Sequence, residues 1–215
     1  FYRPLWTYIA EKRKSKIITI FLSSMSPTKL LQLYPWRLLS WSNYYMWDKT
    51  QLNSIQKFNN TKFNYNLFGY IPTYDDIDKD YILPKADICV FDDPPLDIIN
   101  SVQSGIIDTM YDKDTCFYFL EDIFKISEKY NLKVLYKIKK IHPKIRKGYM
   151  KKIEFYKNKY RQNVEFVPEN LSASHLINNS KLTISFPFTS TAEIANFYKK
   201  NSIYYLPENT SFIPN

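Results

Sequence analysis

The stretch Leu182-Thr-Ile-Ser-Phe-Pro-Phe-Thr-Ser-Thr-Ala192 predicts a strand, a forced turn and a helix in direct succession. Its first residues are apolar and β-branched, as in a buried strand. Pro187 lacks the amide hydrogen that a strand ladder needs, so we expect the strand to end there. Thr189, Ser190 and Thr191 are residue types favoured where a helix begins. A strand that passes straight into a helix is the building unit of a parallel α/β sheet.

The same alternation extends from residue 87 to the C-terminus. Short apolar runs rich in β-formers alternate with longer segments of helical periodicity. The expected strands are Asp87–Phe91, Lys133–Tyr136, Val164–Val167, Leu182–Ser185 and Ser202–Leu206, and the expected helices are Cys116–Tyr130, Tyr149–Tyr160, Ser172–Asn178 and Ser190–Tyr198. Four or five parallel strands with helices between them predict a doubly wound, Rossmann-like α/β domain.

The first seventy residues show a weaker version of this pattern. The expected elements are strands at Ile17–Phe21 and Tyr44–Trp47, a helix at Gln51–Phe58 and an extended stretch at Leu67–Ile71. We interpret residues 1–71 as the closing portion of a separate α/β domain, the Asp-rich residues 72–86 as a linker, and residues 87–215 as the doubly wound domain. Because the chain begins at Phe1, in an aromatic-rich stretch and without a methionine, we expect it to be part of a longer protein.

Composition excludes several classes of protein. The 215 residues are 45% hydrophobic and 24% charged, enough apolar material for one large or two small folded domains. The longest apolar runs fall far short of the roughly 20 residues that span a bilayer. Cys89 and Cys116 form no C-x-x-C pair and the two histidines no cluster, so neither a metal site nor a structural disulfide is expected. The net charge of +9 favours an anionic partner. A bias toward AT-rich codons, which encode many lysines, explains the charge equally well.

Two strand ends carry residues suited to binding a phosphate. The helix expected after Pro187 begins with three hydroxyls, and a helix N-terminus carries about half a unit of positive charge. It also follows the carboxyl end of a parallel strand, where open α/β sheets bind their ligands. His142 and Pro143 follow a second strand, in a lysine-rich run that ends at Lys144. The alternatives are an ordinary helix cap at Thr189–Thr191 and a solvated loop histidine at position 142.

Asp92 and Asp93 are the notable carboxylates, directly after the first strand of the C-terminal domain. They either face a sugar or an acceptor, or form a strand-end turn before two prolines. Asp76 and Asp78 have the D-x-D spacing of metal-dependent sugar transferases, but they lie in the expected linker. We therefore expect no metal and no other cofactor.

The string Pro187-Phe-Thr-Ser190, after Thr183-Ile-Ser185 and before Ser202-Ile-Tyr-Tyr205, resembles the motif of the polysaccharide biosynthesis proteins named for PFTS. The N-terminal part resembles the same family's region ahead of the motif at Arg3-Pro-Leu-Trp-Thr-Tyr8, Glu11-Lys-Arg13, Tyr34-Pro-Trp36 and Met46-Trp-Asp48. The resemblance thus covers most of the chain. It implies a cytoplasmic, bacterial-type enzyme that builds surface or capsular polysaccharide from a nucleotide-activated sugar.

The His142-Pro143 pair resembles the His-Pro motif of bacterial GT-B sialyltransferases and Kdo transferases, in which a Ser/Thr pair follows some tens of residues later. This resemblance implies a GT-B-like, metal-independent inverting glycosyltransferase that prefers a CMP-sugar to a UDP- or GDP-sugar and acts on a glycan or lipid-linked glycan. It also implies that residues 1–71 belong to the acceptor-side domain and that residues 87–215 form the nucleotide-sugar-binding domain. The residues implied to hold the donor nucleotide and phosphate are His142, Pro143, Lys137, Lys144, Thr189, Ser190 and Thr191, and those on the base side are Pro168, Glu169 and Ser172. The acidic triplet that supplies the catalytic base in those enzymes does not occur in this sequence. The base is therefore unassigned, with Asp92 and Asp93 as candidates.

Two other functions remain open. The charge of +9 and the 18% aromatic content would suit a nucleic-acid-binding protein. No nucleic-acid motif occurs, however, and many aromatics occupy expected core positions, so no nucleic-acid partner is expected. The missing base would suit a noncatalytic, nucleotide-binding remnant of a transferase. Peripheral contact with the inner membrane is implied by the family likeness alone, because the sequence shows no readable amphipathic anchor.

Overall fold

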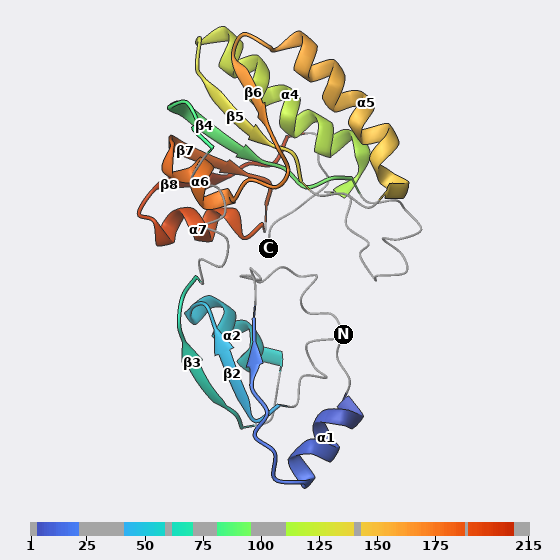
Figure 1. Cartoon of the computed structure of the whole chain (residues 1–215), viewed down its shortest axis with the longest axis vertical. Helices are drawn as coiled ribbons and strands as arrows, with labels where there is room; N and C mark the ends of the chain where they lie inside the picture. The colour runs from blue at the N-terminus through green and yellow to red at the C-terminus, as the bar shows by residue number, and fades with distance from the viewer. Residues whose placement is uncertain are drawn as a thin grey trace. The chain divides into compact units, whose positions relative to one another are not determined.

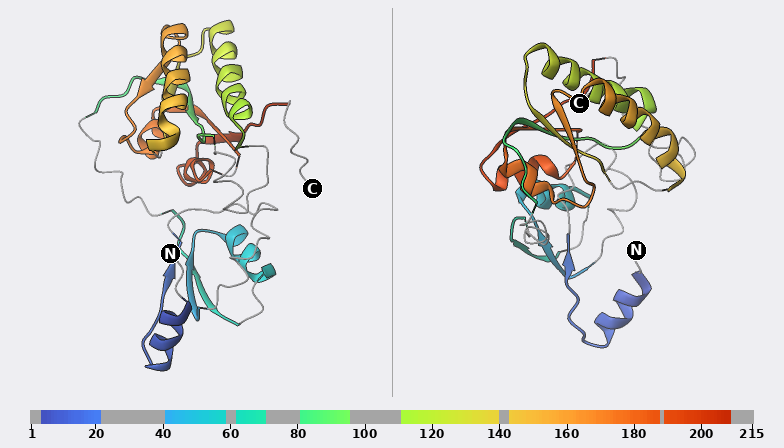
Figure 2. Two further views of the ribbon diagram at one scale, coloured as in Figure 1. Left: turned by 90° about the vertical axis from the view of Figure 1, so that its right-hand side faces the viewer. Right: turned by 45° about the horizontal axis from the view of Figure 1, so that its top comes forward.

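The structure is a computed structural model, and it describes residues 4–21, 41–58, 62–70, 81–95, 111–139, 143–187 and 189–208. The chain forms two compact units, Phe1–Ile71 and Pro72–Asn215. Each unit combines helices with a sheet in which every described strand pairing is parallel (Figures 1 and 2). Both units are therefore α/β.

The N-terminal unit is built on a small sheet with the strand order β1-β2-β3. Its described elements are α1 (Pro4–Lys12), β1 (Thr19–Ile20), β2 (Asn43–Met46), α2 (Lys49–Phe58) and β3 (Asn64–Leu67). Tyr44 and Met46 of β2 are fully buried and pack with Leu52 and Ile55 of α2. The side chain of Asp48, just ahead of α2, accepts a hydrogen bond from a first-turn amide at 2.8 Å and so fixes where the helix begins.

Sequence patterning predicted part of this unit. The predicted positions of β2 and α2 are confirmed to within two residues, and β1 is shorter than expected. The extended stretch expected at Leu67–Ile71 overlaps the end of β3 (Asn64–Leu67), and the amides of Phe68 and Gly69 continue to bond to the segment of β2; Ile71 lies outside the described residues. Asn64 and Asn66 have low β-propensity, and backbone pairing with β2 overrides it. Helix α1 was not predicted.

The C-terminal unit contains a five-stranded parallel sheet in the order β6-β5-β4-β7-β8. Its elements are β4 (Ala86–Phe91), α4 (Lys113–Lys129), β5 (Val134–Lys137), α5 (Pro143–Lys159), β6 (Val164–Val167), α6 (Ala173–Asn178), β7 (Ser180–Ser185), α7 (Thr191–Phe197) and β8 (Asn201–Tyr204). Helices α4 and α5 cover one face of the sheet, and α6 and α7 lie on the other (Figure 1). The predicted doubly wound, Rossmann-like arrangement is confirmed, with five parallel strands.

An aromatic core joins the sheet to α4 and α5. Phe124 of α4 is fully buried, and its ring contacts those of Tyr136, Tyr156 and Phe166 from three other elements. Helix α5 begins six residues before its predicted start, at Pro143, because proline is well tolerated in the first turn, where no amide donor is needed. This core therefore holds α4 and α5 against strands β5 and β6.

The order of the strands creates a topological switch point. From β4 the chain moves outward through β5 to β6, and it then returns to the other side of β4 as β7. Phe91, the last residue of β4, lies in register with Lys137 of β5 and with Ser185 of β7. The carboxyl ends of these three strands therefore lie side by side, at the edge where open α/β sheets bind ligands.

Candidate functional site

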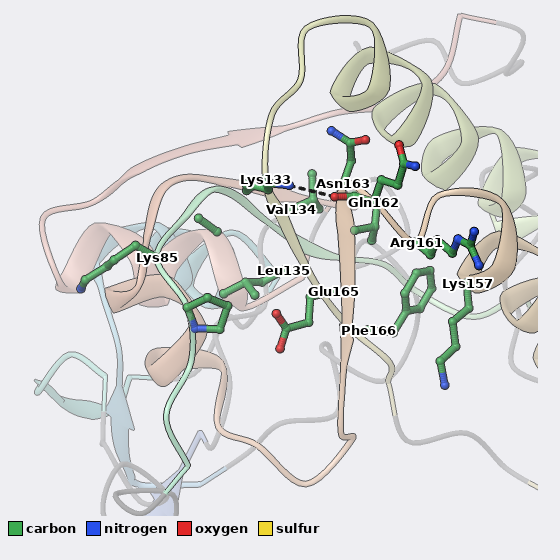
Figure 3. A pocket seen from close by; sticks show the side chains of 13 residues that line it. Lys85, Lys133, Val134, Leu135, Lys157, Arg161, Gln162, Asn163, Glu165 and Phe166 are labelled. Atoms are coloured by element: carbon green, nitrogen blue, oxygen red, sulfur yellow. Dashed lines mark hydrogen bonds between the residues drawn. The ribbon is translucent and has the colours of Figure 1, made fainter.

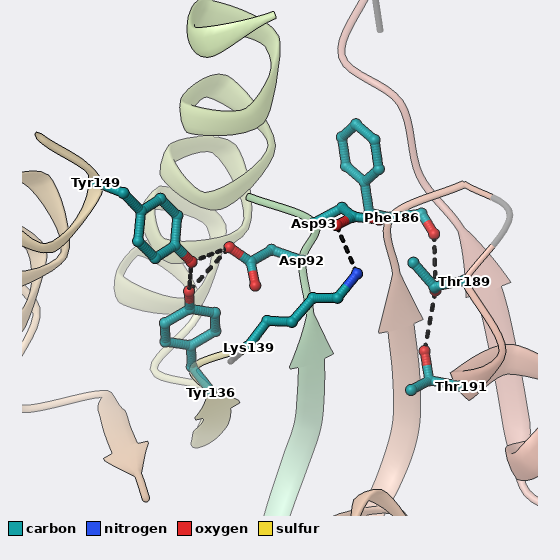
Figure 4. A network of polar contacts seen from close by, with 8 residues as sticks. All are labelled: Asp92, Asp93, Tyr136, Lys139, Tyr149, Phe186, Thr189 and Thr191. Atoms are coloured by element: carbon teal, nitrogen blue, oxygen red, sulfur yellow. Dashed lines mark hydrogen bonds and ion pairs between the residues drawn. The ribbon is translucent and has the colours of Figure 1, made fainter. Parts of the chain in front are cut away.

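The segments after β4 and β7 meet at the switch point. The amide of Phe186 donates a hydrogen bond to the carbonyl oxygen of Phe91 at 2.8 Å. This bond holds Asp92 and Asp93, which follow β4, beside the Pro-Phe-Thr-Ser motif, which follows β7 (Figure 4). Phe186 itself is fully buried and anchors the turn in the core. The residue directly before the motif is thus attached to the sheet.

A chain of hydroxyls crosses the turn between β7 and α7. The hydroxyl oxygens of Ser185 and Thr191 are 2.7 Å apart, and those of Thr191 and Thr189 are 3.0 Å apart. The Thr189 hydroxyl donates to the carbonyl oxygen of Phe186 at 2.9 Å. The hydroxyl of Tyr204, from β8, donates to the carbonyl oxygen of Thr189 at 3.1 Å. Hydroxyl groups therefore link β7, the turn, α7 and β8.

This geometry does not fit the alternative of an ordinary helix cap at Thr189–Thr191. Ser190 is the N-cap residue of α7, and it has helical backbone angles (φ −66°, ψ −13°) and makes no side-chain capping bond. Thr189 and Thr191 bond within the turn instead, because a threonine hydroxyl reaches nearby backbone and hydroxyl oxygens easily. The side chains thus shape the turn rather than cap the helix. Phe188 lies outside the described residues.

Asp92 lies inside the protein, between the end of β4 and helix α5. The side chains of Asp92, Tyr136 and Tyr149 are all buried. The Tyr136 hydroxyl donates to Oδ2 of Asp92 at 3.0 Å, the Tyr149 hydroxyl donates to the same oxygen, and the two hydroxyl oxygens are 2.5 Å apart (Figure 4). Among the described residues, the other carboxylate oxygen, Oδ1, is buried without a hydrogen-bond partner. Asp92 therefore holds three elements together.

Burial controls the ionisation of this group. Loss of hydration raises the pKa of Asp92 to about 6, and the two tyrosine hydrogen bonds offset only part of that rise. The pKa values of Tyr136 and Tyr149 are also raised, first by burial and then by the nearby carboxylate. Asp92 is thus a carboxyl group that changes charge near neutral pH.

Asp93 has a different environment from its neighbour. Its carboxylate forms an ion pair with the ammonium group of Lys139 at 2.6 Å, and both side chains are partly exposed. Lys139 follows β5, so this pair joins the ends of two adjacent strands. Sequence patterning did not single out Lys139. Lys139 lies two residues beyond Lys137. Which of the two lysines reaches Asp93 depends on the register of β5 with β4, and the sequence alone does not show that register.

The remaining predicted residues have structural contacts of their own or lie at the start of α5. Lys137 donates to the backbone carbonyl oxygen of Glu169 at 2.9 Å, which joins the end of β5 to the segment after β6, where Pro168 also lies. Ser172 is buried and caps α6 by accepting a hydrogen bond from the amide of His175 at 3.2 Å. Pro143 and Lys144 begin α5. His142 lies outside the described residues.

A pocket of about 590 Å³ lies at the opposite edge of the same sheet, where β4, β5 and β6 begin (Figure 3). Its lining includes Lys85, Lys133, Lys157 and Arg161. Lys133 donates to the backbone carbonyl of Gln162 at 2.8 Å. Helix α5 ends here, and cations near a helix C-terminus neutralise its partial negative charge. The positive charge at this edge therefore has a structural explanation. In the part of the chain that is described, no three His, Cys, Asp or Glu side chains form a metal-binding group.

A parallel sheet whose switch point gathers carboxylates, hydroxyls and a lysine defines a doubly wound, Rossmann-like α/β protein with its candidate site at the carboxyl edge. The whole sequence identifies the family. The chain belongs to the polysaccharide biosynthesis PFTS motif proteins, the family that matches residues 1–212. The resemblance to that family is thereby confirmed, and the family description indicates a role in polysaccharide biosynthesis.

The narrower likeness to sialyltransferases and Kdo transferases stays a prediction. No curated protein matches the sequence. None of the described helices is both long and apolar enough to cross a membrane.

Proposed function

We propose that this protein is a glycosyltransferase that transfers a sugar from a nucleotide-sugar, preferably a CMP-sugar, to a glycan or lipid-linked glycan. In this proposal it is a cytoplasmic, metal-independent enzyme of the GT-B type. One observation carries the proposal: the motif for which the family is named lies at the topological switch point of a doubly wound sheet. Ligands of such sheets bind at that point.

The donor phosphate is proposed to bind beside the turn after β7. Thr189, Ser190 and Thr191 would contact the phosphate, together with the amides that begin α7. His142, Pro143, Lys137 and Lys144 would approach from the β5 side, and Pro168, Glu169 and Ser172 would lie near the nucleotide base. Lys139 joins this set, because its ammonium group already reaches the end of β4. Positive groups placed there would stabilise the charge that grows on the departing nucleotide.

Donor binding has better support than the transfer step. Transfer needs a base close to the acceptor hydroxyl. Asp92 is only 4% exposed and turned into the core, and the carboxylate of Asp93 is paired with Lys139. This observation favours a second candidate function, a noncatalytic nucleotide-binding protein.

Thermal unfolding with CMP, UDP and GDP tests the proposal. We expect CMP to raise the melting temperature most, and Ser190→Ala and Thr189→Val to reduce that rise. Ser180→Ala is the matched control, because its hydroxyl donates to the carbonyl oxygen of Leu176 at the amino end of β7, away from the proposed phosphate site. Hydrolysis or transfer of a CMP-sugar would separate an enzyme from a binding protein. Absence of any nucleotide effect, with salt-dependent RNA binding instead, would overturn the proposal.

A further inference from the structure

Helix α1 shows its apolar side to solvent. Helices of globular proteins normally bury their apolar stripe and expose their polar face. In α1 the less exposed positions are Thr7, Ala10 and Glu11, and the Glu11 carboxylate accepts a hydrogen bond from Ser42 at 2.5 Å, just ahead of β2. The exposed fractions on the other side are 65% for Leu5, 68% for Trp6, 54% for Tyr8 and 41% for Ile9. Within its unit, α1 lies apart from α2, at the far end of the small sheet (Figures 1 and 2).

A cluster of positive charge directly follows these apolar side chains. The side chains of Lys12, Arg13, Lys14 and Lys16 are all exposed. The ammonium group of Lys12 lies 4.8 Å from the ring centre of Tyr8, so the charged and apolar parts form one surface. Lys14 has a left-handed backbone (φ 60°), which turns the chain back from α1 toward β1. Glu11, the one acidic residue between Leu5 and Lys16, is bonded to Ser42.

We propose that the surface from Leu5 to Lys16 docks on an anionic phospholipid bilayer. Leucine and isoleucine side chains would enter the acyl boundary, and tryptophan and tyrosine favour the level of the headgroups. Lysine and arginine gain electrostatic attraction from anionic lipids. A nine-residue helix is about 14 Å long, so it lies in the plane of the interface and does not cross it.

The charges favour a membrane over a second copy of this chain. A symmetric contact between two copies pairs one patch with itself, so four cations of one copy would approach four of the other. That repulsion opposes dimerisation, whereas a negatively charged bilayer is complementary to the same residues. The inference concerns where the protein binds and is independent of the proposed sugar transfer.

Co-sedimentation of the chain with lipid vesicles tests the proposal without any nucleotide. We expect binding to vesicles of equal parts phosphatidylcholine and phosphatidylglycerol, and much weaker binding to phosphatidylcholine alone. Replacing Lys12, Arg13, Lys14 and Lys16 by Gln should weaken binding about fivefold for each charge removed. The triple variant Leu5→Ser, Trp6→Ser, Ile9→Ser should lose about tenfold for each apolar side chain.

The matched control is the double variant Tyr118→Ser, Ile126→Ser on α4, whose side chains are also about half exposed, at 45% and 50%. It should bind anionic vesicles as the unmodified chain does. Circular dichroism and the urea midpoint verify that all variants remain folded. Absence of vesicle binding, or equal binding by the triple variant, would overturn the proposal. A dimer that the triple variant abolishes would also overturn it, because the surface would then belong to a second copy.

Discussion

The two edges of the five-stranded sheet carry positive charge for different reasons. At the amino edge, Lys133 and three other cations line a pocket, and Lys133 donates to the backbone carbonyl of Gln162 near the end of α5. At the carboxyl edge, Lys139 is paired with Asp93, and polar side chains that follow the strands bond to one another. The amino edge contains the pocket of about 590 Å³, whereas the carboxyl edge contains the polar groups that bond to one another. The site that we propose therefore rests on the direction of the strands and not on volume or charge.

Removing the buried anchor of the carboxyl edge should have the largest effect. Phe186 is fully buried, with its ring 5.3 Å from that of Phe119 and 5.8 Å from that of Tyr111. Phe186→Ala should cost about 3 to 5 kcal/mol of unfolding free energy, because it leaves a cavity. Urea unfolding measures the loss. Phe197→Ala, at a half-exposed position, is the control and should change stability by about 0.5 kcal/mol or less. Equal losses in the two variants would show that the turn after β7 is not anchored in the core.

The second effect is a pH dependence centred on Asp92. Burial raises its pKa from 3.8 to about 6, so the folded state favours the protonated form. The contribution of this group to stability is therefore complete below pH 3.8 and is lost as the pH rises through 6. The difference between the two pKa values corresponds to about 3 kcal/mol of unfolding free energy. Asp92→Asn removes the titration, so its stability relative to the unmodified chain should rise by about that amount between pH 4 and pH 8.

The groups around Asp92 determine the control for this experiment. Tyr136 and Tyr149 face it from β5 and α5, Cys116 from α4, and Asp93 and Lys139 lie at the strand ends. Asp93→Asn breaks a partly exposed ion pair and should lower stability by about 1 kcal/mol or less at pH 7. Parallel pH curves for the unmodified chain and Asp92→Asn would show that Asp92 does not titrate in this range.

Local pattern predicted the elements of the C-terminal unit better than it predicted the contacts between them. Strand β6 has the predicted bounds, because Val164–Val167 is a short run rich in β-forming residues between polar breaks. The environment of Asp92 could not be predicted, because its partners Tyr136 and Tyr149 are 44 and 57 residues away in sequence. Helix α1 was not predicted. Its apolar side chains are exposed and do not pack into a core, so they lack the spacing with polar residues that marks a core-facing helix.

The hydroxyl chain should show a smaller, coupled effect. Thr191→Val leaves the buried hydroxyl of Ser185 without its partner and should cost about 1 to 2 kcal/mol. Ser185→Ala should cost about 1 kcal/mol. The double variant should cost less than the sum of the two, because both changes remove the same hydrogen bond. Urea unfolding of the four proteins measures this coupling. Strict additivity would mean that the bond between these hydroxyls does not stabilise the turn.

The smallest effect should come from the amino edge. Lys157 and Arg161 are exposed beside the end of α5, and Lys157→Gln with Arg161→Gln removes two cations that complement its partial negative charge. Each change should cost about 0.5 kcal/mol at low salt and less at high salt, where the attraction is screened. The rise in melting temperature caused by CMP should stay unchanged, because a phosphate at this edge would meet the negative end of the helix. If the double variant abolished that rise, the nucleotide would bind in the amino-edge pocket. The direction of the strands would then be the wrong guide to the site in this protein.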